Sequence, residues 1–168
     1  MDSRKNEVVL GLDPGSRCTG YGVIQEKSGR LELLETGTIR PDVNKDLSNK
    51  LGYIFQELVK IIQCFEPREA AVEDVFVSYN SSSALKLGQA RGAVLVACSH
   101  QNVEVTAYEP TFIKQSLVGA GRAEKSQVAF MVGRFLGMKP NWSKDSSDAL
   151  AAAICHLNMR RSEIWQRK

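Results

Sequence analysis

Three strand-like segments in a row, before any helical one, constrain the fold of this chain more than any other feature. Segment 7–13 is almost continuously apolar, which is typical of a buried central strand. Segments 19–26 and 30–39 follow, and the short link between them contains the turn-forming pair Ser28 and Gly29. We therefore expect the chain to open with an antiparallel meander.

Beyond residue 40 the periodicity changes to alternating helices and strands. Apolar residues recur at three- and four-residue steps over 46–65, and Pro67 ends this helix. Segments 69–77 and 103–108 read as further strands. Further helices are expected at 81–100, 110–118, 124–136 and 146–160.

This order predicts an α/β fold with a mixed five-stranded sheet flanked by helices, in which crossover connections follow the meander. Ribonuclease-H-like nucleases share the order, and so does each half of the actin-like ATPases, so the order alone does not decide between them. Because the chain has no internal repeat and no linker, we expect one domain over 1–160 and a basic tail over 161–168.

Composition narrows the class of protein. Of the 168 residues, 43% are hydrophobic and 24% charged, as in a soluble globular domain. No apolar run approaches the roughly 20 residues that span a bilayer. The first residues are too polar for a signal peptide, so we expect a cytoplasmic protein. The widely spaced cysteines form no metal motif and are expected to be free and to fill apolar space: Cys18, Cys64, Cys98 and Cys155.

The net charge is only +3, but the basic residues are unevenly distributed. Between Lys114 and Lys144 there are six basic residues and one acid, Glu124. The last nine residues hold four basic residues and one acid. Such asymmetry favours contact with phosphates, although a solvated basic face would give the same pattern.

Four acidic residues stand out by position. Asp13 ends the first strand segment, and Glu73 lies in the otherwise apolar stretch AAVEDVF. Asp145 and Asp148 are three residues apart and therefore share one face of the last helix. If the first and fourth strands pair, Asp13 lies beside Glu73. Taken singly, each acid also has a purely structural explanation. Asp13 could form a turn, and Asp145 or Asp148 could cap a helix. Glu73 could point outward from its strand without any special role.

Electrostatics decide what a converging set would mean. Two like charges 4 Å apart repel by about 4 kcal/mol at an effective dielectric near 20, so a cluster needs a cation or must stay partly protonated. Carboxylate oxygens suit Mg²⁺ or Mn²⁺. Two such ions roughly 3.5–4 Å apart can activate water and stabilise the leaving oxygen of a phosphodiester. Convergence would therefore indicate a metal-dependent phosphodiesterase.

Five sequence strings, in order over residues 8 to 158, carry a family resemblance: LGLDPGSRCTGYGVI, AVEDVF, SALKLGQARG, VGAGRAEKSQV and DSSDALAAAI. Together they resemble the RuvC family of bacterial Holliday-junction resolvases. The resemblance implies a ribonuclease-H-like fold and a homodimer that acts on four-way DNA junctions in recombination and repair. It also implies symmetric nicking of two opposing strands with Mg²⁺ or Mn²⁺, ligatable products, and the branch-migration proteins RuvA and RuvB as partners.

The resemblance assigns roles to individual residues. It implies metal-binding, catalytic carboxylates at Asp13, Glu73, Asp145 and Asp148. It implies that Lys114 and Lys125 assist catalysis or grip phosphates, and that Phe76 stacks on a base at the junction centre. The full set of expected DNA contacts is Phe76, Asn80, Lys86, Arg91, Lys114, Arg122 and Lys125. Asp74 occupies a position that is often neutral in the family, and strand alternation directs it away from the metals.

Other readings are weaker. An actin-like ATPase needs a second half that this chain is too short to contain. The string GAGRAEKS is no phosphate-binding loop, because Glu124 replaces its second glycine. A YqgF-type nuclease of ribosomal RNA maturation would lack SALKLGQARG and AEKSQV, and a junction-binding protein without activity would not need all four carboxylates. The apolar residues of 81–100 exceed one stripe, so this helix is either buried in the core or shared between subunits.

Overall fold

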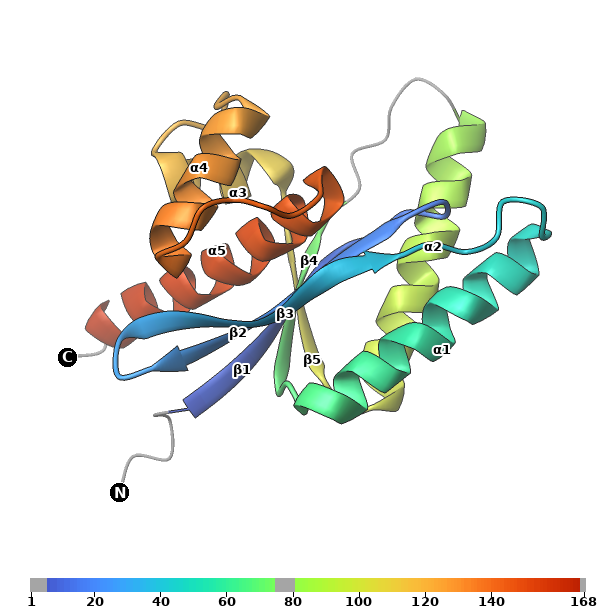
Figure 1. Ribbon diagram of the computed structural model, residues 1–168, viewed down its shortest axis with the longest axis horizontal. Coiled ribbons are helices and arrows are strands. Elements are labelled where there is room, and N and C mark those ends of the chain that lie inside the picture. The colour runs from blue at the N-terminus through green and yellow to red at the C-terminus, as the bar shows by residue number, and fades with distance from the viewer. Residues whose placement is uncertain (1–5, 75–80, 167–168) are drawn as a thin grey trace.

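The computed structural model describes residues 6–74 and 81–166, which form one five-stranded sheet with helices on both faces (Figure 1). The strands are β1 (Asn6–Asp13), β2 (Thr19–Lys27), β3 (Arg30–Ile39), β4 (Glu69–Glu73) and β5 (Glu104–Tyr108). The helices are α1 (Leu47–Phe65), α2 (Ser81–His100), α3 (Pro110–Val118), α4 (Lys125–Leu136) and α5 (Lys144–Gln166).

The strand order is β3-β2-β1-β4-β5. β1, β2 and β3 pair as antiparallel neighbours, whereas β4 lies parallel to β1 and β5 parallel to β4. The predicted meander, the crossovers and the mixed five-stranded sheet are therefore confirmed. In the parallel pair Leu12 lies opposite Val72, so β1 and β4 end side by side.

Two element boundaries differ from the prediction by more than two residues. The fourth strand was expected over 69–77, but β4 ends at Glu73, and 75–77 lie outside the described residues. The last helix was expected to end at residue 160 but continues to Gln166. Arg161 explains part of this extension, because its guanidinium donates to Glu26 of β2 at 2.8 and 3.1 Å.

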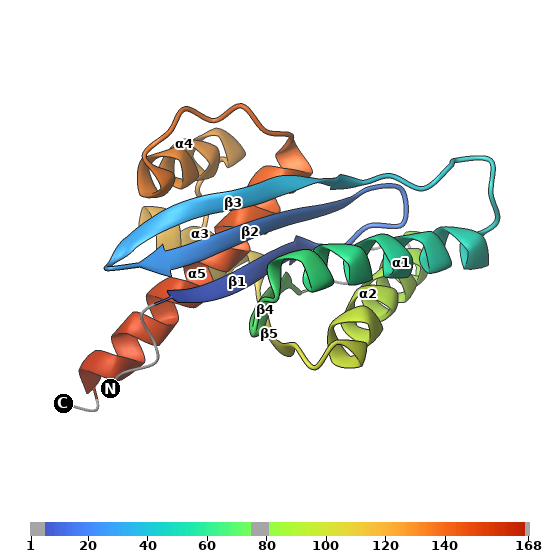
Figure 2. The same cartoon turned by 60° about the horizontal axis from the view of Figure 1, so that its bottom comes forward.

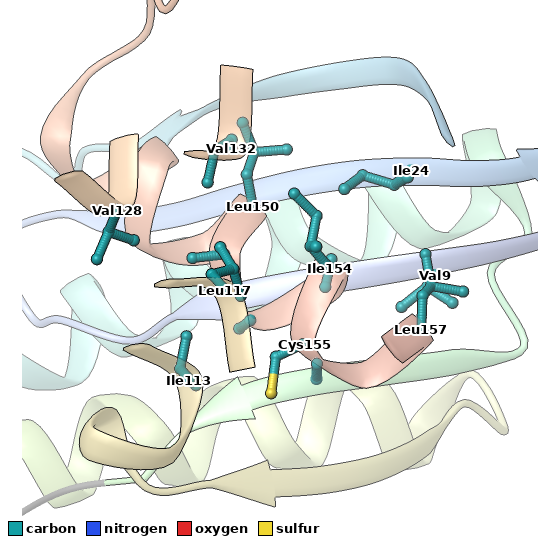
Figure 3. Close-up of a cluster of buried hydrophobic side chains, with 14 of the residues drawn as sticks. Val9, Ile24, Ile113, Leu117, Val128, Val132, Leu150, Ile154, Cys155 and Leu157 are labelled. Carbon is teal, nitrogen blue, oxygen red and sulfur yellow. The ribbon is translucent and has the colours of Figure 1, made fainter. Parts of the chain in front are cut away.

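Alternation along β1 explains why that strand is apolar throughout. Val9 belongs to a core cluster with α3, α4 and α5, whereas its neighbour Leu10 packs with α1 and α2. Figure 2 shows these two helix groups on opposite faces of the sheet. Figure 3 shows the first cluster, in which Leu150 and Ile154 of α5 lie against Val9 and Ile24. Burying each of these side chains stabilises the fold by about 1.5–3 kcal/mol.

Glycines let α5 lie directly on the sheet. A Cβ atom at Gly11 would collide with the carbonyl oxygen of Ala149, and one at Gly20 would collide with the backbone of Asp145. Close packing against α5 therefore requires glycine at both positions. This contact places the first turn of α5 above the end of β1.

Candidate active site

The first two carboxylates of the site come from the ends of β1 and β4. Side chains alternate along both strands, so Asp13 follows Val9 and Gly11 onto the face covered by α5. Glu73 reaches the same face two residues after Ala71. The two side chains are hydrogen-bonded to each other, which requires a proton between them.

The other two carboxylates come from the start of α5. Asp145 and Asp148 lie within the first turns of this helix, and both act electrostatically on Asp13. Burial, followed by the charges of Glu73, Asp148 and Asp145, raises the pKa of Asp13 from 3.8 to about 8. The sequence prediction that these acids converge agrees with this geometry.

Glu73 shares this environment but is better compensated. Burial and the charge of Asp148 raise its pKa, whereas the hydrogen bond from Asp13 and the charges of Lys125 and Lys114 oppose the rise. The pair therefore holds the proton of its hydrogen bond more tightly than a free carboxyl group would.

Two lysines flank the carboxylates on the β5 side. Lys125 begins α4, after a capping box between Glu124 and Gln127, and its Nζ donates to Asp148 Oδ2 at 2.7 Å. This hydrogen bond raises the pKa of Lys125, so the ammonium form is favoured. Lys114, on α3, lines a small cleft together with Glu73, Asp148 and Lys125.

The donor set fits a hard divalent cation. Among the described residues, no three His, Cys, Asp or Glu side chains already stand as a preformed metal site. In this structure Asp13 is hydrogen-bonded to Glu73, and Asp148 to Lys125. The four carboxyl groups have the oxygen atoms that Mg²⁺ or Mn²⁺ would require, and the cation would replace the proton that Asp13 holds at neutral pH.

Two residues that contact Asp145 were missed by sequence reasoning. The Cys18 thiol donates to Asp145 Oδ2 at 3.1 Å, and an Arg40 terminal nitrogen lies 4.0 Å from the same oxygen. Burial and the contact with Asp145 raise the pKa of Cys18 to about 11. Only the position of Cys18 in the turn after Asp13 could have indicated this contact.

The cysteine expectation is thus correct in part. Cys98 and Cys155 are buried apolar fillers, but Cys64 is exposed and Cys18 contacts a carboxylate, so for these two the prediction was wrong. All four are free thiols, as expected.

The expected DNA contacts have different surroundings. Arg91 of α2 pairs with Asp74 at 3.2 Å, on the sheet face opposite the carboxylates, where alternation was expected to direct Asp74. Lys86 and Arg122 are exposed, and Phe76 and Asn80 lie outside the described residues. Their contacts with DNA stay predictions.

Comparison with known proteins agrees with the geometry. The family model described as crossover junction endodeoxyribonuclease RuvC matches residues 9–156. The chain belongs to the RuvC family. It is 57% identical to the RuvC of Solidesulfovibrio magneticus, over 96% of this chain and 95% of that protein. RuvC of Saccharophagus degradans is 46% identical, over 94% and 91% of the two chains.

Solved structures extend the RuvC likeness to three dimensions. Thermus thermophilus RuvC matches with a TM-score of 0.84 and 34% identity, over 93% of this chain and 96% of that one. The same protein in complex with a Holliday junction substrate also gives 0.84, at 32% identity. RuvC-family nucleases are metal-dependent, which agrees with the donor set. Within the described part of the chain, no helix has the length and apolarity to cross a membrane.

Proposed function

We propose that this protein is a crossover junction endodeoxyribonuclease. It resolves four-way DNA junctions in recombination and repair by hydrolysing phosphodiesters symmetrically in two opposing strands, and it leaves nicks that a ligase can rejoin. The observation that carries the proposal is the meeting of Asp13, Glu73, Asp145 and Asp148 at the ends of β1, β4 and α5, in a chain of the RuvC family.

Those four carboxylates would hold divalent cations, with Mg²⁺ in two positions and Mn²⁺ as a substitute. Bound there, the ions would supply an activated water and stabilise the leaving oxygen. Asp13 must lose its proton before it can act as a ligand, so uptake of the cation competes with that proton.

The two lysines would assist the carboxylates and bind the DNA strand. Lys125 holds Asp148 through the 2.7 Å hydrogen bond and reduces the repulsion within the cluster. Lys114 and Lys125 lie on one side of the carboxylates, where their ammonium groups can contact the phosphates of a bound strand. The expected contacts of Phe76, Asn80, Lys86, Arg91 and Arg122 with DNA belong to the same proposal.

A homodimer fits this activity, because two coordinated cuts on a roughly two-fold substrate need two sites. Exposed apolar residues on helix α2 support a contact between subunits at this helix. Val94 and Ala97 are buried against the sheet, whereas Leu85 and Val96 are 65% and 59% exposed. The RuvA and RuvB branch-migration proteins would act with this dimer in the bacterial cytoplasm.

Nicking of a labelled mobile four-way junction tests the function, with linear duplex and RNA as controls. We expect paired symmetric cuts on the junction in Mg²⁺, and none in EDTA or with Asp13→Asn, while binding survives. Cutting of RNA instead would favour the rRNA-processing relatives. Tight binding without cutting in any divalent ion would leave a junction-binding protein.

A further inference from the structure

A second cleft, of about 580 Å³, shares one residue, Arg40, with the surroundings of Asp145. The connection between β3 and α1 and the first turns of α1 form it, and Figure 2 shows this connection extending beyond the sheet. Three cations, Arg40, Lys45 and Lys50, line the cleft with one carboxylate, Asp42.

Arg40 connects this cleft to the active site. Its side chain is 62% exposed, and a terminal nitrogen lies 4.0 Å from Asp145 Oδ2. Its Nε donates to Thr38 Oγ1 at 3.1 Å, which orients the guanidinium at the end of β3. A guanidinium has five N–H donors, so Arg40 can keep both contacts and still donate to an anion.

The lysines of the cleft differ in how they are held. The Lys50 ammonium donates to the carbonyl oxygen of Val43 at 2.8 Å and thereby ties the connection to α1. Lys45 is exposed, and its backbone N–H closes a turn on the carbonyl oxygen of Asp42. Lys45 is therefore the residue whose charge can be removed with the least effect on the shape of the cleft.

The nearby acids are engaged locally. Asp42 Oδ1 accepts from the Asn44 backbone N–H at 2.9 Å. Asp46 caps α1 and accepts from the backbone N–H of Asn49 at 2.8 Å, so the end of this helix already has its anion. Binding of a further anion must rest on the three side-chain cations.

The order of the sheet shows what these cations fit. Arg40 follows β3, at one edge of the sheet, whereas Lys114 and Lys125 line a cleft with Glu73 at the end of β4. In the strand order β1, which ends at Asp13, lies between β3 and β4. The carboxylates repel a DNA strand, so cations must provide its binding energy. A strand whose scissile phosphate lies at the carboxylates has neighbouring phosphates on both sides.

We propose that the cleft of Arg40, Lys45 and Lys50 binds a backbone phosphate of the cut DNA strand, away from the scissile one. The inference rests on the proposed function and adds a second contact surface to it. Phosphate contacts of this kind fix register and carry no base preference, so the cleft positions the strand across the carboxylates.

Junction affinity as a function of salt tests the cleft, measured in EDTA so that no strand is cut. Lys45→Gln and Arg40→Gln are compared with Lys60→Gln, an exposed lysine farther along α1 that pairs with Glu57 outside the cleft. Each cleft variant is expected to weaken binding several-fold and to reduce the slope of log affinity against log salt by about one. Equal affinities and slopes in the three variants would overturn the proposal.

A neutral methylphosphonate moved along the cut strand locates the contact. One position outside the scissile phosphate should weaken binding by the wild-type protein and have no further effect on Lys45→Gln. If the two losses add fully at every position, the cleft does not hold a phosphate of that strand. A wild-type protein that neither binds nor cuts junctions would instead reject the proposed function, so the two failures are distinguishable.

Discussion

The two ends of β1, β4 and α5 carry similar charged residues in opposite arrangements. At one end Asp13, Glu73 and the acids of α5 face one another. At the other end Glu7 and Glu69 lie on the same sheet face, but α5 presents basic residues to them. Asp13 lies six positions after Glu7 along β1, which is about 20 Å of strand.

At the far end each acid is paired with a group of the same chain. Arg160 pairs with Glu7 and also with Glu69, the latter at 2.8 Å. Buried His156 lies between the Tyr108 hydroxyl, 2.8 Å from Nδ1, and Glu69 Oε2, 2.9 Å from Nε2. Each acid has a partner within the chain, which is the arrangement expected where charges serve stability.

The difference separates structural charges from functional ones. Acids that lie against basic side chains are stabilised without a bound ligand. Acids that lie against other acids raise one another's pKa values and make the folded protein less stable. A fold keeps such a cluster where a cation or a reaction compensates for it. Removing one acid from each end in turn tests this difference.

Asp13→Asn should have the largest effect. We expect junction nicking in Mg²⁺ to fall by more than the roughly 10–100-fold that residues supporting a metal ligand typically cost. The metal-free protein should be at least as stable as the wild type, because one member of a repelling set is gone. Nicking rates and urea unfolding check both parts. A clear loss of stability with unchanged nicking would show that Asp13 serves the stability of the fold and not the reaction.

The pH dependence of metal-free stability is the next effect. The pKa of Asp13 is about 8 in the folded protein and near 3.8 when unfolded. Between these values the folded state holds a proton that the unfolded state has released, so stability falls as pH rises, by up to about 1.4 kcal/mol per pH unit. Below about pH 4 the contribution is complete, and above about pH 8 it is lost.

Urea unfolding in EDTA from pH 5 to 9 measures this slope. The difference between wild type and Asp13→Asn should grow with pH in favour of the variant, and Mg²⁺ should reduce it by replacing the proton. Parallel curves for the two proteins would show that Asp13 is ionised without a cation and that the acids are less crowded than described.

Sequence reasoning could predict one end of this comparison but not the other. Strand and helix periods, together with side-chain alternation, place Asp13, Glu73 and Asp148 on converging faces, and these patterns are local. The network around His156 depends on the position of α5 along the sheet. That position is set by contacts such as Gly11 with Ala149 and cannot be read from one segment. The contacts of Cys18 and Arg40 with Asp145 depend on the same docking.

Glu69→Gln tests the end at which each acid is paired. It removes the acceptor charge shared by His156 and Arg160 and should lower the free energy of unfolding by about 2 kcal/mol, as for hydrogen bonds to charged groups. Nicking per folded molecule should stay unchanged. Glu104→Gln, on β5 opposite Glu69, is the matched control and should have little effect. A loss of nicking without a loss of stability would give this end a role in function.

Arg161→Gln gives the smallest effect and separates two roles for the end of the chain. Its bonds to Glu26 join half-exposed groups, so we expect a loss of stability within about 1 kcal/mol. If Arg161 serves only to hold α5 against β2, junction affinity and its salt slope should match those of Arg30→Gln, a control at an exposed site on β3. A slope shallower by about one would instead place Arg161 on a phosphate and make the basic tail of 161–168 part of the DNA-binding surface.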